Sequence, residues 1–217
     1  MDTLQKYKIM RNAGQSLHGK TMEVVPTIIM THVFMEFGKW KKGTLVCDEE
    51  DLAPMMDRLF YDKKWNGKGV VKHYLEQKGS GDLTSQEIQF VEAMKTNIFS
   101  LFLVVETNSR TKAVLLRDIL GQDMREFNLV DIGMSETMKK GALLASRIIN
   151  VGEFHMTTGV AHPFNPEHEF EIFEYLKENR LWGPKMRKTA RDGYPLAFYK
   201  MRKIFSQNIV MEFGDVE

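Results

Sequence analysis

Five short runs of strand-type residues follow one another in the middle of the chain, and they constrain its fold more than any other feature. Apolar and β-branched residues fill each run, and glycine or polar residues separate the runs at 100–105, 112–120, 125–132, 142–151 and 154–160. The connections are too short for a helical crossover, so we expect antiparallel neighbours. Residues 99–160 are therefore predicted to form a five-stranded antiparallel, barrel-like sheet.

Helical patterns lie on both sides of this segment, so we predict an α+β protein. Helices are expected over most of 4–98 and 167–206, with an early break near His18 or at Pro26. Thr84 and Glu87 have the spacing of a capping box, and Asp51 follows Asp48 at the same spacing. The predicted parts are a helical region at 1–98, a β-barrel-like module at 99–165 and a C-terminal helical region at 166–217, packed as one compact unit.

Composition indicates a globular protein that needs neither a disulfide nor a metal to fold. Among 217 residues, 43% are hydrophobic and 27% are charged. Cys47 is the one cysteine, which excludes an intrachain disulfide and favours a reducing, cytoplasmic compartment. The apolar stretch from Val24 to Phe37 is too short and too polar to span a bilayer. We therefore predict no membrane association and no cofactor.

Residues 177–203 carry the strongest charge asymmetry, in a chain whose net charge is only +1. Nine basic residues stand there against two acidic ones, with aromatic residues between them. This pattern can bind nucleic acid or an acidic protein, or it can be the solvated face of a helix. The charge separation can also drive head-to-tail self-association. The residues predicted to bind are Arg187, Lys188, Arg191, Lys200, Arg202 and Tyr194.

Three histidines within fourteen residues, His155, His162 and His168, raise the question of a metal site. Imidazole nitrogens are common ligands of transition metals, and several glutamates lie nearby. However, the spacings of seven and six residues match neither one face of a helix nor one face of a strand. The sequence therefore favours histidines scattered in a solvated loop, with a metal site as the alternative.

Two charged residues lie inside predicted strands. Arg147 interrupts an apolar run, so its side chain must pair with an acid or reach water. Asp118 is the partner we predict, and such a pair would hold two strands together. The alternative is a site for a substrate anion.

The motifs of several enzyme classes are missing from the sequence. It contains no Walker-type phosphate loop, no Gly-x-Gly-x-x-Gly after a strand, no Gly-x-Ser-x-Gly and no His-Glu-x-x-His. We therefore predict a non-catalytic binding or adaptor protein. Nucleic-acid binding through 177–203 and metal-dependent catalysis through the three histidines are the alternatives.

Turn and packing motifs in the middle of the chain carry a family resemblance. They are LFYD at 59–62, VVKHYL at 70–75, LTSQE at 83–87, LRDILG at 116–121 and GALLASR at 141–147. Over about 55–165 the chain resembles uncharacterised bacterial proteins, several of which carry a SEC-C zinc motif. The resemblance implies a shared fold and no assigned activity. A single cysteine leaves no SEC-C motif here, so no zinc-binding or partner role of that motif carries over.

Overall fold

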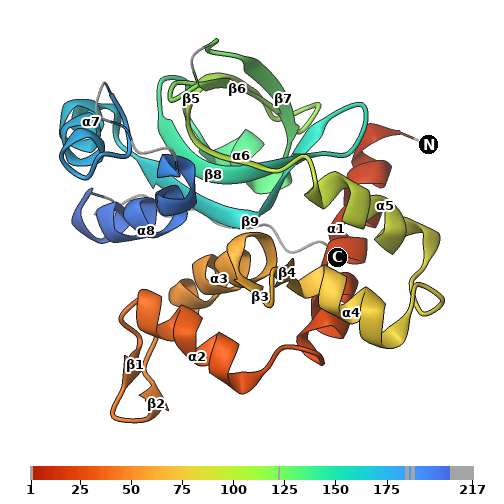
Figure 1. The fold of residues 1–217 in the computed structure, drawn as a ribbon. Helices are drawn as coiled ribbons and strands as arrows, with labels where there is room; N and C mark the ends of the chain where they lie inside the picture. The colour runs from red at the N-terminus through yellow and green to blue at the C-terminus, as the bar shows by residue number, and fades with distance from the viewer. Residues whose placement is uncertain (1, 122, 184–185, 187–188, 206–217) are drawn as a thin grey trace. The chain divides into compact units, whose positions relative to one another are not determined.

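The computed structural model describes residues 2–121, 123–183, 186 and 189–205. The chain divides into two compact units (Figure 1). Residues 8–97 form one, which we call the helical unit, and residues 1–7 with 98–217 form the other, which we call the barrel unit. The finer division into three regions stays a prediction.

The helical unit combines helices with very short hairpins. Its helices are α1 (Thr3–Met22, which starts in the barrel unit), α2 (Thr27–Glu36), α3 (Glu49–Asp57), α4 (Val70–Lys78) and α5 (Ser85–Met94), and a π-helical turn at Arg58–Asp62 extends α3. The hairpins pair β1 (Trp40–Lys41) with β2 (Thr44–Leu45), and β3 (Lys64–Trp65) with β4 (Lys68–Gly69). Strands of two residues are too short to alternate, so no sequence pattern predicted them.

Local signals in the sequence mark three helix starts in this unit. Pro26 directly precedes α2, which confirms a break at this proline. Glu87 Oε2 accepts a hydrogen bond from the Thr84 backbone N–H at 2.7 Å, and Thr84 Oγ1 accepts one from the Glu87 N–H at 3.2 Å. Asp51 Oδ2 accepts a bond from the Asp48 N–H at 3.0 Å. Both predicted capping boxes are confirmed.

Five strands close into a barrel in the barrel unit (Figure 1). They are β5 (Ile98–Asn108), β6 (Ala113–Asp118), β7 (Glu126–Val130), β8 (Leu143–Asn150) and β9 (His155–Phe164). Their order is β5-β6-β7-β9-β8, and β8 pairs back with β5.

One strand pair corrects the prediction of an antiparallel sheet. All neighbours in the barrel are antiparallel except β7 and β9, which run parallel. Directions can alternate all the way round a closed ring only when the number of strands is even. A closed barrel of five strands therefore requires at least one parallel pair, and the sheet is mixed.

Apolar side chains fill the barrel, and a helix that the sequence analysis did not predict adds to this core. The helix α6 (Ile132–Thr137) lies between β7 and β8, and Asp131 caps it by accepting a bond from the Met134 N–H at 3.0 Å. Six residues are too few to show a helical repeat. The interior cluster consists of Phe102, Val104, Val114, Leu116, Phe127, Leu129, Met134, Met138, Leu144 and Ile148.

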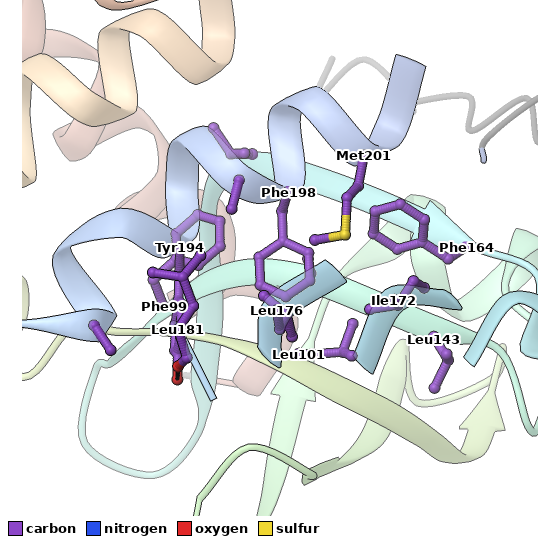
Figure 2. Close-up of a cluster of buried hydrophobic side chains, with 14 residues drawn as sticks. Phe99, Leu101, Leu143, Phe164, Ile172, Leu176, Leu181, Tyr194, Phe198 and Met201 are labelled. Atoms are coloured by element: carbon purple, nitrogen blue, oxygen red, sulfur yellow. Dashed lines mark hydrogen bonds between the residues drawn. The ribbon is translucent and has the colours of Figure 1, made fainter. Parts of the chain in front are cut away.

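Two C-terminal helices, α7 (Glu169–Glu178) and α8 (Tyr194–Phe205), pack on the outside of the barrel. Phe198 of α8 is fully buried, with ring centroids 6.2 Å from Phe99 of β5 and 6.1 Å from Phe164 of β9 (Figure 2). Short 3₁₀ helices precede α7 and α8, at Pro166–His168 and Ala190–Gly193. Across the described ranges, no helix combines the length and apolar character needed to cross a bilayer.

Candidate functional site

The outer side of β6 and β7 is left uncovered by the C-terminal helices. The cluster beneath α7 and α8 takes its barrel residues from β5, β8 and β9, and none from β6 or β7. Side chains alternate along both strands, so those between the interior residues point outward and remain at least partly exposed. We call this surface the β6–β7 face; it comprises Leu115, Arg117, Glu126, Asn128 and the neighbouring Glu106 of β5.

Strand register sets the pattern of the β6–β7 face. Leu115 lies opposite both Glu106 and Asn128, which puts an aliphatic side chain between two polar ones. Arg117 lies opposite Glu126, and its Nε and Nη2 donate to Glu126 Oε1 at 3.0 and 2.6 Å. Both side chains are about 40% exposed, and exposed ion pairs contribute only about 0.2–1 kcal/mol. The pair therefore orders two charged groups that a partner can still reach.

The loop between β5 and β6 borders this face and is held by its own hydrogen bonds. Asn108 Oδ1 accepts bonds from the N–H groups of Arg110 at 3.1 Å and Thr111 at 3.2 Å, an Asx turn. Lys112 closes the loop with a positive φ of 55° and forms an ion pair with Glu136 of α6. The loop thus presents the exposed Arg110 from an ordered backbone.

Asp118 organises the loop between β6 and β7, which borders the β6–β7 face at the end opposite the β5–β6 loop. This role explains the LRDILG motif. Its Oδ1 accepts bonds from Ser100 Oγ at 2.5 Å, the Leu120 N–H at 3.0 Å and the Gly121 N–H at 2.9 Å. A Cβ at Gly121 would lie 2.7 Å from Asp118 Oδ2, so a larger residue would displace the carboxylate. The motif supports the fold of this edge.

Replacing Asp118 by alanine should lower the free energy of unfolding of the barrel unit by about 2–4 kcal/mol. The side chain is only 6% exposed, and its loss leaves the Ser100 hydroxyl and two backbone N–H groups without their acceptor. Urea unfolding followed by circular dichroism measures the change. Asp123→Ala, an exposed position in the same loop, should change stability by less than about 0.5 kcal/mol. Equal effects of the two variants would contradict the role given to Asp118.

The structure does not bring Asp118 and Arg147 together. Asp118 lies opposite Phe102, whose side chain belongs to the barrel interior. Arg147 lies opposite Phe99, whose side chain belongs to the outer cluster, and its Cζ is 5.3 Å from the centroid of that ring. The predicted partners therefore project from opposite sides of the barrel wall. The sequence predicts the strands of both residues but not the side of the barrel wall that each side chain faces.

The three histidines do not form a metal site. His155 and His162 both lie on β9, seven residues apart, so an extended strand separates them by roughly 23 Å. His168 lies beyond the strand, with its ring 5.3 Å from that of Phe205. Among the described residues, no three histidine, cysteine or acidic side chains come close enough to hold an ion. The structure therefore does not bring His155, His162 and His168 together as one ligand set.

The predicted solvated loop is wrong at His162, because β9 continues to Phe164. The His162 side chain is 1% exposed, and neither ring nitrogen has a hydrogen-bond partner within the described part of the chain. Burial, with a smaller contribution from Arg202, lowers the pKa of His162 to about 3. This histidine is a neutral core residue near neutral pH.

The structure separates the residues of the predicted basic site. Tyr194 is 2% exposed, and its hydroxyl donates to the Leu181 carbonyl at 3.1 Å, so its ring belongs to the core (Figure 2). Arg191 and Lys200 are exposed, whereas Arg202 is half-buried. Arg187 and Lys188 lie outside the described residues. A binding role of the basic residues stays a prediction.

Sequence reasoning missed the β6–β7 face although it predicted both strands. The alternation of apolar and polar residues could have shown that each strand has one exposed side. Which side of the barrel stays uncovered depends on where α7 and α8 pack, and their contacts join residues as far apart in sequence as Phe99 and Phe198.

Comparisons with known proteins place the chain in a family without assigning an activity. No curated protein and no solved structure matches the chain. A family model described as a family of unknown function, DUF7986, matches residues 1–212. This match shows no relation to proteins with a SEC-C motif, so that relation stays a prediction. Because the matched range covers nearly the whole sequence, the chain belongs to the DUF7986 family of unknown function.

Proposed function

We propose that this chain is a non-catalytic, cytoplasmic binding protein whose β6–β7 face contacts a protein partner. One observation carries the proposal: this outer side of the barrel is free of the helices that cover β5, β8 and β9. It presents the half-exposed Leu115 beside the ordered pair of Arg117 and Glu126. An apolar centre with a polar rim is the usual composition of a protein interface.

The topology of the barrel supports binding at this position. Its strand order, its parallel closing pair and the helix between its third and fourth strands are those of the OB barrel. OB barrels bind their ligands on the outer side of the second and third strands and on the loops beside them. In this chain β6 and β7 are the second and third strands of the barrel. This is an analogy of fold, and it supports the place of binding rather than the kind of ligand.

The side chains of the face favour protein over single-stranded nucleic acid. Nucleic-acid platforms combine basic grooves with aromatic rings on which bases stack. The β6–β7 face carries the carboxylates of Glu106 and Glu126 against one guanidinium, and Phe127 of β7 points into the barrel. Mixed charges around Leu115 match a protein surface of complementary charge.

The test begins with a photoreactive amino acid at the exposed Asn128, which captures the partner in native cells. With the captured protein purified, Arg117→Glu should raise its Kd at least tenfold, because the variant places three carboxylates on the face. The double variant Arg117→Glu with Glu126→Arg restores the ion pair but reverses its direction. It should remain weak if the partner contacts these charges, and recovery of wild-type affinity would show that the pair only supports the fold.

Two controls complete this experiment. Ile88→Glu adds one negative charge at an exposed apolar position of the helical unit and should leave the Kd unchanged. Anisotropy with labelled single-stranded DNA and RNA tests the other ligand class. Micromolar binding that weakens steeply with salt and is lost in Arg117→Glu would show that the partner of this face is nucleic acid and not a protein.

A further inference from the structure

The helix α7 turns an acidic surface with one large aromatic ring towards solvent. Phe170 is 74% exposed, the largest exposed fraction among the large apolar side chains of the described residues. Glu169 and Glu171 flank it and are exposed as well. In the part of the chain that the structure describes, no ion pair neutralises either carboxylate. The start of α7 therefore exposes an apolar ring between two carboxylates.

The helix α8 presents the opposite charge. Lys200 and Ile204 are one helical turn apart and both exposed, Ile204 at 58%. Lys203 is exposed beside them, with its Nζ 5.3 Å from the centroid of the Tyr199 ring. Three basic residues and no acidic one lie between Tyr194 and Phe205. The exposed side of α8 is therefore basic, again with an apolar residue on it.

The two helices pack on the same outer cluster of the barrel, and their labelled residues run in opposite directions along it (Figure 2). At one end the ring of His168, just before α7, is 5.3 Å from that of Phe205 at the end of α8. At the other end the Tyr194 hydroxyl bonds to the Leu181 carbonyl after α7. The acidic residues at the start of α7 and the basic residues near the end of α8 therefore lie at the same end of the helix pair, and we treat their exposed sides as one surface. We call it the α7–α8 surface; its residues are Glu169, Phe170, Glu171, Lys200 and Ile204.

We propose that the α7–α8 surface binds a second copy of this chain in a dimer with two-fold symmetry. A two-fold axis between the helices sets α7 of each copy against α8 of the other, so acid meets base twice. The same arrangement removes Phe170 and Ile204 of both copies from water. A different protein would need a basic half and an acidic half in matching positions, whereas a second copy already has both. This interface is independent of the β6–β7 face.

Charge reversal on each helix tests the proposal, and mixing the two variants tests whether dimer formation is restored. Sedimentation and light scattering should show that the wild type is a dimer. Glu171→Lys alone and Lys200→Glu alone should each raise the dimer dissociation constant at least tenfold, because each puts two like-charge contacts into the homodimer. An equal mixture of the two variants should form a heterodimer of near wild-type affinity, since both of its contacts then join opposite charges.

Further variants distinguish dimer formation through this surface from a general effect of the protein's charge. Phe170→Ser should weaken the dimer at least tenfold while leaving the fold intact, because the ring is mostly exposed in the single chain. Lys140→Glu makes the same charge change as Lys200→Glu, but at an exposed loop position, and should leave the dimer dissociation constant unchanged. A wild type that stays monomeric at high protein concentration would overturn the proposal. So would a dimer insensitive to Phe170→Ser, or a series of rising masses that indicates open-ended association.

Discussion

Replacing Phe198 by alanine is expected to lower the free energy of unfolding of the barrel unit by about 3–5 kcal/mol, the usual loss for a fully buried phenylalanine. The ring fills the centre of the contact between α8 and the barrel, with ring centroids 6.0 to 6.2 Å from those of Tyr194, Phe164 and Phe99 (Figure 2). Removing it leaves a cavity that these side chains can only partly fill. The loss of this packing should weaken the contact between α8, which carries exposed lysines, and the barrel.

Tryptophan fluorescence can measure this change in the barrel unit alone. Trp182 packs against the same cluster, whereas Trp40 and Trp65 belong to the helical unit and can be replaced by phenylalanine. Guanidinium unfolding of this background should show the transition of Trp182 at lower denaturant in the Phe198→Ala protein. Phe170→Ala removes the same side chain from an exposed position and should cost less than about 0.5 kcal/mol at protein concentrations too low for association. Similar losses in both variants would contradict the packing described for Phe198.

The strands could be predicted from the sequence because their signals are local. Alternating apolar residues and intervening turn residues placed all five strands close to their observed ranges. The pairing of β7 with β9 is not local, because β8 lies between them in sequence and not in the sheet. Ring closure with five strands would have required a parallel pair, but only the structure shows that the ring closes.

The candidate site was harder to predict because one pattern of residues has two interpretations. The aromatic residues of 177–203 fit a stacking platform between basic residues, but they equally fit the core contact of a helix whose other face is solvated. Tyr194, Phe198 and Met201 recur at intervals of four and three, which is the spacing of the buried face of a helix. This spacing favours the second interpretation, with the rings in the core and the lysines outside. The β6–β7 face lacked any comparable signal, since its exposure follows from the packing of distant helices.

Replacing Glu87 by glutamine should cost the helical unit about 2–4 kcal/mol at neutral pH, because this buried carboxylate joins α1 to the start of α5. Glu87 is 1% exposed and accepts bonds from Ser16 Oγ at 2.7 Å, Lys20 Nζ at 3.1 Å and the Thr84 N–H at 2.7 Å. Burial alone would raise the pKa of Glu87, but these bonds outweigh burial and lower the pKa to about 2. Urea unfolding with Trp65 as the reporter measures the loss.

The direction of the Glu87 pKa shift also predicts how pH affects the helical unit. A carboxylate whose pKa is lower in the folded state stabilises that state at pH values above the unfolded pKa, here 4.5. This contribution declines as the pH falls from 4.5 and is lost once the pH passes below about 2. The difference in stability between wild type and Glu87→Gln should therefore shrink between pH 5 and pH 3. Glu92→Gln changes a carboxylate on the same helix that is exposed and paired with Lys95, so it should show a small difference at both pH values. A wild-type advantage over Glu87→Gln that stays constant down to pH 3 would show that packing, and not the charge of Glu87, holds α1 and α5 together.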